Sequence, residues 1–226
     1  TLLDPQIQTL NNANLADITL ISGYGKEKLH AEGVNIMENP DYKKGSMLNS
    51  LLIAKEKMVN GFIMLYSDIL MEDHILSKLM ECKEDIILVA DNSTQYHLPE
   101  EGNFLDYIIS KSQHKPERRE IRFISENIVA NIGNKINPET ATHEFIGLAR
   151  FSKTGAEQFL ETYNDVISNF AGPFQESKDI SSLTFTDLVQ EMIDRGFAIH
   201  FMEIHKGWLE IHNTDHIALA QKSFSA

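Results

Sequence analysis

An acidic residue just behind an apolar run is the first feature that could do chemistry. Residues 62–66 read Phe-Ile-Met-Leu-Tyr, which is typical of a buried strand, and Asp68 follows after one serine. Ligands of an open parallel sheet collect outside the carboxyl ends of its strands, so we expect Asp68 to bind Mg²⁺ there. A solvated aspartate that starts a turn has the same local pattern, and spacing alone leaves both interpretations open.

A second candidate lies near the end of the chain, at residues 204–212. Glu210 and His212 are two positions apart, so their side chains lie on the same side if this segment is extended. Because Mg²⁺ prefers oxygen ligands, Glu210 suits such an ion better than His212 does. For His212, a surface position or a supporting position behind the ligands is an open alternative.

The elements that must position these residues alternate along the chain. Apolar runs at 18–21, 62–66 and 86–90 predict buried strands, and helical spacing predicts helices at 46–58 and 73–82. Alternation of this kind indicates strands connected by helices that cover the sheet. We therefore expect an α/β fold with a Rossmann-like, mainly parallel mixed sheet flanked by helices.

The second half of the chain begins with weaker order. Residues 91–142 are polar, with weak strand signals at 107–109 and 128–130, and we assign them to an insertion of loops and short strands. Beyond it the pattern predicts a strand, an amphipathic helix and a capped helix, at 145–149, 156–167 and 184–196. Residues 1–226 are expected to form a single domain.

Size and charge restrict the function. A chain of 226 residues suits one α/β domain, and its formal net charge of -13 would repel the phosphates of DNA or RNA. No apolar run approaches the roughly 18 residues of a membrane span, and the first residues lack the basic start of a signal peptide. We therefore expect a cytoplasmic protein that binds neither nucleic acid nor membrane.

Five short motifs occur in the order found in one enzyme family. They are Gly45–Met47, Tyr66–Ile69, Glu144–Gly147, Phe185–Leu188 and Gly207–Ile211. Together they resemble the nucleotidyltransferase family, most closely the phosphonate and phosphocholine cytidylyltransferases and the nucleotidyltransferase domain associated with phosphoenolpyruvate phosphomutase. Each motif is weak alone, but the resemblance covers nearly the whole chain.

The resemblance implies a catalytic Mg²⁺ ion held by a strand-end aspartate and by acidic residues of a late Trp-x-Glu-Ile-Asp segment. The matching positions here are Asp68, Glu210 and His212. His212 departs from the family's aspartate, which removes a negative charge and changes the preference for metals. A weaker site, a different metal or a role for nearby Asp215 stays open.

Residues near the nucleotide base are implied in the same way. By resemblance, Asn39, Gly45, Ser46 and Met47 lie where a close backbone and short polar side chains read the edge of cytosine. Ser46 also suits the N-cap of the helix that follows, and the two roles are compatible.

Four further residues match positions on the acceptor side of the family's site. Glu144 and Asp187 could pair with an amino or quaternary ammonium group, Trp208 could offer a cation–π face, and Lys206 could neutralise a phosphate. Each has a structural alternative. Asp187 suits a capping box with Thr184, Trp208 suits packing, and Lys206 suits an exposed turn.

Family members usually carry a strand, a glycine-rich loop with a basic residue and a Lys-Pro segment before the counterpart of Thr1. The present sequence contains none of these. Such a loop supplies N–H groups and positive charge to a triphosphate. We expect truncation rather than a natural pseudoenzyme.

The expected reaction is attack by an acceptor phosphonate or phosphate oxygen on the α-phosphorus of CTP, with release of pyrophosphate. The first-choice acceptor is 2-aminoethylphosphonate. Phosphocholine, a sugar 1-phosphate and a nucleotide-binding pseudoenzyme are the alternatives, and fusion to another biosynthetic domain or a homo-oligomer is compatible with each.

Overall fold

The computed structural model describes residues 2–93, 105–111, 127–213, 216–217 and 220. Its helices are α1 (Leu3–Asn12), α2 (Met47–Leu51), α3 (Asp73–Glu81), α4 (Lys153–Asn169) and α5 (Phe185–Asp194), with shorter 3-10 turns η1 (Lys26–Lys28), η2 (Leu52–Lys57) and η4 (Ile180–Ser182). Its strands are β1 (Ile18–Ser22), β2 (Val34–Glu38), β3 (Phe62–Leu65), β4 (Ile69–Met71), β5 (Ile86–Asp91), β6 (Tyr107–Ser110), β7 (Val129–Gly133), β8 (His143–Phe151), β9 (His200–Ile204) and β10 (Trp208–Glu210).

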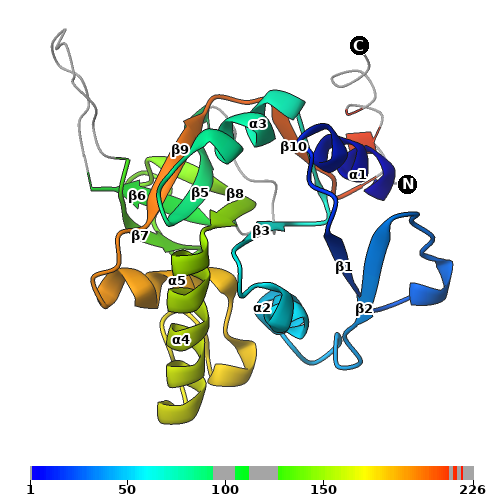
Figure 1. Cartoon of the computed structure of the whole chain (residues 1–226). Coiled ribbons are helices and arrows are strands. Elements are labelled where there is room, and N and C mark those ends of the chain that lie inside the picture. Colours follow the sequence, from blue (N-terminus) through cyan, green and yellow to red (C-terminus); the bar gives the residue numbers. More distant parts are fainter. Residues whose placement is uncertain (1, 94–104, 112–126, 214–215, 218–219, 221–226) are drawn as a thin grey trace, which may run out of the picture.

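A six-stranded sheet forms the centre of the molecule (Figure 1). The order is β7-β6-β8-β5-β9, and β3 also pairs with β8. The long strand β8 has β5 along one edge, while β6 pairs with residues 143–144 and β3 with residues 148–151. Two small sheets lie beside this one, namely the parallel pair β1–β2 and the antiparallel pair β4–β10.

The α/β class and the mixed sheet flanked by helices are confirmed, but the direction of the strands differs from the expectation. Strand β8 runs antiparallel to β3, β5 and β6, and the parallel pairs within the described residues are β1–β2 and β5–β9. An apolar run reports burial on both faces and carries no information about direction, which explains the error. Strands β6 and β7, within the polar stretch 91–142, extend one edge of the central sheet.

Helices cover both faces of this sheet, and β5 shows how its sequence serves both. Ile86 and Leu88 pack into a cluster with residues of α2, α4 and α5, whereas Ile87 and Val89 pack into a second cluster with α3. All four are at most 1% exposed. Since neighbouring strand residues point to opposite faces, an uninterrupted apolar run is what a doubly covered strand requires.

Short polar side chains begin several helices. Thr184 and Asp187 form a reciprocal capping box at the start of α5, as the sequence predicts. The expected helix at 46–58 is present in two parts, because α2 gives way at Leu52 to the tighter η2. In the part of the chain that the structure describes, none of the helices combines the length and the apolar character needed to cross a bilayer.

Candidate metal site

The small sheet β4–β10 brings two distant acidic residues together. Asp68 directly precedes β4, Glu210 ends β10, and Glu210 is paired with Ile69 in the ladder. The amide of Ile211 donates a hydrogen bond to the carbonyl oxygen of Asp68 at 2.7 Å. Backbone pairing therefore fixes the separation of the two carboxylates, although 142 positions separate them in the sequence.

Helix α1 supports the same turn from the other side. The side-chain amide of the buried Gln6 donates to the carbonyl oxygens of Tyr66 and Ile69, at 3.0 and 2.7 Å. These two carbonyls bracket Asp68 in the sequence. The backbone that carries the carboxylate is thus held by α1 as well as by β10.

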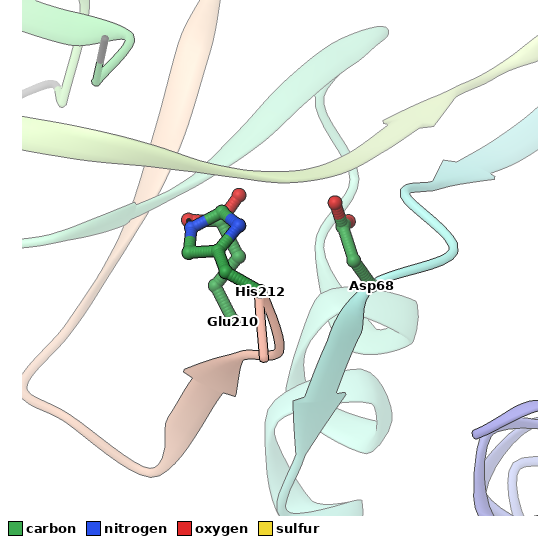
Figure 2. Close-up of side chains that lie close together, drawn as sticks. All are labelled: Asp68, Glu210 and His212. Carbon is green, nitrogen blue, oxygen red and sulfur yellow. Dashed lines mark ion pairs between the residues drawn. The ribbon is translucent and has the colours of Figure 1, made fainter. Parts of the chain in front are cut away.

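Asp68, Glu210 and His212 form a cluster with ligand atoms on three side chains (Figure 2). One ligand atom of each lies within 4.8 Å of the others, and His212 Nε2 lies 2.9 Å from Glu210 Oε2. Figure 2 shows Glu210 and His212 side by side, with Asp68 facing them across a short gap. The sequence anticipated this convergence, whereas metal binding by the three residues stays a prediction.

The donor set fits a divalent cation. Asp68, Glu210 and His212 each offer one ligand atom to the same small space, so these three side chains would hold a single ion between them. Two carboxylates suit Mg²⁺ or Mn²⁺, and an imidazole favours Mn²⁺ or a later transition metal. Burial raises the pKa of Glu210, although the nearby His212 opposes this shift, while the charge of Asp68 adds to it.

Asp91 holds the strand that carries Glu210. This carboxylate is 4% exposed and accepts hydrogen bonds from Trp208 Nε1 at 2.7 Å and from the Lys206 amide at 3.1 Å. It also accepts from the amide and the hydroxyl of Ser93. Burial alone would raise the pKa of Asp91, but these hydrogen bonds lower it below its ordinary value.

Sequence reasoning missed Asp91, although the signal was present. The residue follows the apolar run 86–90 directly, in the same kind of position as Asp68 behind 62–66. The hydrogen bond from Trp208 Nε1 to Asp91 shows that this indole anchors the strand. A cation–π role for Trp208 stays a prediction. Lys206 is exposed in a turn with φ 64°, and its predicted contact with phosphate likewise stays a prediction.

Further carboxylates share the electrostatic environment of this site. Glu144, at the start of β8, is paired with Asp91 of β5 and with Tyr107 of β6. Burial raises the pKa of Glu144 to about 8, with contributions from Asp91, Glu210 and Asp106. Burial also raises the pKa of Asp106 to about 6, so at neutral pH Glu144 is mostly protonated whereas Asp106 keeps most of its charge.

Tyr66 lies among the same acidic groups. Its pKa is raised well above the ordinary value, mainly by burial and also by the charges of Asp106, Asp68 and Glu210. Neither Tyr66 as a single residue nor Asp106 stood out as a site candidate in the sequence. Asp106 is not next to any recognised motif, and only the pairing of β6 with β8 brings it to this end of the sheet.

Among the residues predicted to contact the acceptor substrate, Asp187 has the contacts that differ most from such a role. Its carboxylate accepts from the amide and hydroxyl of Thr184, at 2.9 and 2.7 Å, and from the amide of Glu176 at 2.8 Å. The hydroxyl of Ser177 provides a further donor. These bonds show the capping role, and contact with an acceptor stays a prediction.

The predicted base-binding residues surround the start of α2. Asn39 is buried, and its side-chain amide donates to Ser50 Oγ at 3.0 Å. Ser46 caps α2 and also donates to the carbonyl of Leu183. Gly45 lies close against Asn49, Met47 is 52% exposed, and Asp215 lies outside the described residues. Contact of this region with a nucleotide base stays a prediction.

A cavity of about 690 Å³ opens between β1 and β3. It is lined by residues of α1, β1, η2 and β3, and it reaches Ser67 next to Asp68. This volume lies within the usual range for small-molecule sites. Asp68, Glu210 and His212 do not line this cavity, which comes nearest to them at Ser67.

Comparison with known proteins shows what this arrangement is similar to. No family model matches the chain. A CTP:phosphoglutamine cytidylyltransferase of Campylobacter jejuni subsp. jejuni serotype O:2 is 22% identical over 223 residues, which span 93% of this chain and 83% of that protein. The inferred resemblance to nucleotidyltransferases is thereby confirmed, at a distant level of identity.

Solved structures agree on the fold. The inositol-1-phosphate CTP transferase from T. maritima matches with a TM-score of 0.69 and 16% identity, over 99% of this chain and 82% of that one. The CTP:phosphocholine cytidylyltransferase from Streptococcus pneumoniae (LicC) matches with a TM-score of 0.66 and 14% identity, over 98% of this chain and 84% of that one. The chain has the nucleotidyltransferase fold.

Proposed function

We propose that this protein is a CTP-dependent cytidylyltransferase that moves CMP onto a phosphonate or phosphate oxygen of a small acceptor. The observation that carries the proposal is the convergence of Asp68, Glu210 and His212 at one end of a nucleotidyltransferase fold. Its relatives bear the names of enzymes that use CTP with phosphoglutamine, inositol 1-phosphate or phosphocholine. We expect the reaction to take place in the cytoplasm.

The chemistry is a displacement at phosphorus. An acceptor oxygen forms a bond to the α-phosphorus of CTP, the bond from that phosphorus to the bridging oxygen breaks, and pyrophosphate leaves with the electron pair. The acceptor is already an oxyanion, so no protein nucleophile is needed and positioning supplies most of the rate.

Asp68 and Glu210 would hold the divalent cation, with His212 as a third ligand. When bound, Mg²⁺ would neutralise charge that develops on the phosphates. The ladder between β4 and β10 keeps the two carboxylates at a fixed separation before any ligand arrives. Preorganisation of this kind lowers the cost of assembling the site.

For the acceptor we propose a phosphonate, with 2-aminoethylphosphonate as the first choice, because the motifs most resemble those of phosphonate cytidylyltransferases. Phosphocholine or a sugar 1-phosphate is the second candidate, and the name of the LicC structure favours phosphocholine. The three differ in the group attached to phosphorus, so competition between acceptors separates them.

Pyrophosphate release tests the proposal directly. The complete protein is incubated with Mg²⁺, one nucleoside triphosphate and one acceptor, and the CMP-linked product is identified by ³¹P NMR. We expect turnover with CTP and a phosphonate or phosphate acceptor, and loss of turnover in Asp68→Asn. Glu161→Gln, which removes an exposed carboxylate on α4, is the matched control. Binding of CTP without turnover across the whole panel would indicate a nucleotide-binding protein instead.

A further inference from the structure

Gln6 is a buried polar residue of α1 whose side chain reaches a turn far away in the sequence. It is 7% exposed, whereas Gln8 on the same helix is exposed. Its Nε2 atom donates to the carbonyl oxygens of Tyr66 and Ile69, at 3.0 and 2.7 Å. A polar side chain is costly to bury unless it is hydrogen-bonded, so these two bonds explain how α1 accommodates a glutamine there.

The two carbonyl groups lie at the two ends of the turn that carries Asp68. Residues 66–69 lead from β3 into β4, and Asp68 is the third of these four residues. The amide of Tyr66 donates to the carbonyl oxygen of Gly147 at 3.0 Å, and the carbonyl oxygen of Asp68 accepts from the Ile211 amide at 2.7 Å. The central sheet and β10 therefore each hold the turn at one point, while one carboxamide of α1 joins its two ends.

Gln6 also takes the place of a neighbouring strand at β4. This strand pairs with β10 along one edge, and no strand among the described residues pairs with its other edge. Successive carbonyl groups of a strand point to opposite edges, so that of Asp68 faces β10 and that of Ile69 faces α1. Ile69 is 1% exposed, and without Gln6 its carbonyl oxygen would lose this donor.

The other polar contacts from this face of α1 lie beyond the far end of β4. Thr9 Oγ1 and Asn12 Nδ2 donate to the carboxylate of Asp73 at 2.8 and 2.6 Å. Asp73 begins α3, and both bonds are exposed. The helix therefore has one contact that holds the Asp68 turn and separate contacts that hold only α3.

We propose that Gln6 is a positioning residue for Asp68 in the candidate metal site. This inference rests on the proposed transferase function, and it adds a residue that lies outside the five motifs. By fixing the carbonyl groups of Tyr66 and Ile69, Gln6 keeps the Asp68 backbone where its carboxylate faces Glu210. Gln6 is not one of the three residues of the cluster, so its effect on an ion passes through Asp68.

The affinity for Mn²⁺ tests the positioning role. Gln6→Met keeps an unbranched side chain of similar length and removes its N–H groups, so it should lower Mn²⁺ affinity by about tenfold, as the loss of groups that orient a ligand does. Gln8→Met, on the exposed side of α1, should leave the affinity unchanged. Thr9→Val removes a bond between α1 and Asp73 and should leave it unchanged as well. Calorimetric titration of the metal-free proteins provides the measurement.

Hydrogen exchange gives a second readout that needs no metal. The Ile211 amide is bonded to the carbonyl oxygen of Asp68, so its exchange rate reports how firmly the turn is held. We expect Gln6→Met to speed this exchange by about three- to tenfold, which corresponds to the loss of roughly one hydrogen bond. The Glu72 amide, bonded to the Gly207 carbonyl at 2.9 Å at the other end of the same ladder, should change less.

The outcomes separate this inference from the proposed function. Equal Mn²⁺ affinity in Gln6→Met and the unaltered protein would overturn the positioning role while the metal site stands. An equal loss in Thr9→Val would also overturn it, because the effect would then belong to the docking of α1 as a whole.

The exchange measurement covers the case in which the unaltered protein binds no Mn²⁺. The metal site would then be refuted, and an unchanged exchange rate of the Ile211 amide in Gln6→Met would show that Gln6 does not hold the turn either. If Gln6→Met does not fold, Gln6→Asn takes its place, because its carboxamide is one methylene too short to reach both carbonyl groups.

Discussion

The amide of Ile211 donates a hydrogen bond to the carbonyl oxygen of Asp68 at 2.7 Å, and this contact continues the β4–β10 ladder to the candidate metal site. Side chains alternate along a strand, so a slip of one residue would turn Glu210 away from Asp68. At the other end of β10, the amide of Glu72 donates to the carbonyl oxygen of Gly207 at 2.9 Å and continues the same ladder. Backbone geometry, more than side-chain attraction, brings the carboxylates together.

Removal of either carboxylate should weaken metal binding. Loss of a residue that merely hydrogen-bonds to a metal ligand already lowers metal affinity by about 10- to 100-fold. Loss of a ligand itself, in Asp68→Asn or Glu210→Gln, should therefore lower the affinity by at least about 100-fold. Calorimetric titration with Mn²⁺ measures the loss of affinity. The control Glu161→Gln should bind Mn²⁺ as tightly as the unaltered protein does. Unchanged affinity in both Asp68→Asn and Glu210→Gln would refute the assignment of the ligands.

Replacement of the imidazole should change which metal is preferred. His212→Asp restores the oxygen-rich set that Mg²⁺ favours and removes a nitrogen ligand that later transition metals favour. We expect the ratio of Mg²⁺ to Mn²⁺ affinity to rise by about tenfold or more. An unchanged ratio would show that His212 lies outside the coordination sphere.

Glu144 should make the ligand-free protein less stable as the pH rises. Its pKa is about 8 in the folded protein against 4.5 ordinarily, so the folded state binds this proton more tightly. Its contribution to stability is therefore complete below pH 4.5 and falls until the pH passes about 8.

Glu144→Gln removes that titration. Between pH 6 and pH 8 the free energy of unfolding of the unaltered protein should fall by about 2 kcal/mol more than that of the variant. Urea denaturation at the two pH values provides the measurement. Parallel losses in both proteins would show that Glu144 is not the responsible group.

Asp91 should contribute to stability far more than an exposed aspartate does. Asp91→Ala leaves the N–H groups of Trp208 and Lys206 without their acceptor, at a cost of at least about 2 kcal/mol. Asp17→Ala removes an exposed ion pair with Lys57 and should cost no more than about 0.5 kcal/mol. Denaturation of the two variants, followed by circular dichroism, compares them, and equal losses would contradict the anchoring role.

Gly147 should tolerate no side chain, because Tyr66 packs against it. A methyl group at Gly147, where φ is 77°, would overlap the ring of Tyr66, whereas one at Gly172, where φ is 86°, would meet no atom within 4 Å. Both substitutions carry similar backbone strain, so the difference measures the overlap. We expect Gly147→Ala to cost about 1–3 kcal/mol more than Gly172→Ala, again measured by denaturation.

Local sequence predicted those features that depend on local chemistry. The apolar run of β5 predicted a strand covered on both faces, and Thr184 with Asp187 predicted the N-terminal cap of α5. Asp68 and Asp91 show where such reasoning stops. Each follows an apolar run, yet Asp91 is enclosed by donors from residues 115 and 117 positions away, whereas Asp68 faces Glu210 and His212. Only the pairing of β4 with β10 and of β5 with β9 distinguishes the anchoring Asp91 from the candidate metal ligand Asp68.

The direction of β8 could not be predicted from local sequence either, because it depends on tertiary pairing. Its apolar residues specify burial, whereas its orientation is seen only in its pairing with β3, β5 and β6. That orientation brings Glu144 beside Asp91 and Asp106 to the same end of the sheet. The grouping of these carboxylates therefore follows from topology, whereas the resemblance indicated only Glu144.

Trp208 is the single tryptophan of the protein, and its indole nitrogen is bound to Asp91 two residues before Glu210. All indole fluorescence consequently originates within this strand. Emission and quenching will report events at the cluster of Asp68, Glu210 and His212 without any attached dye, and the protein carries its own spectroscopic reporter for ions and nucleotides that enter there.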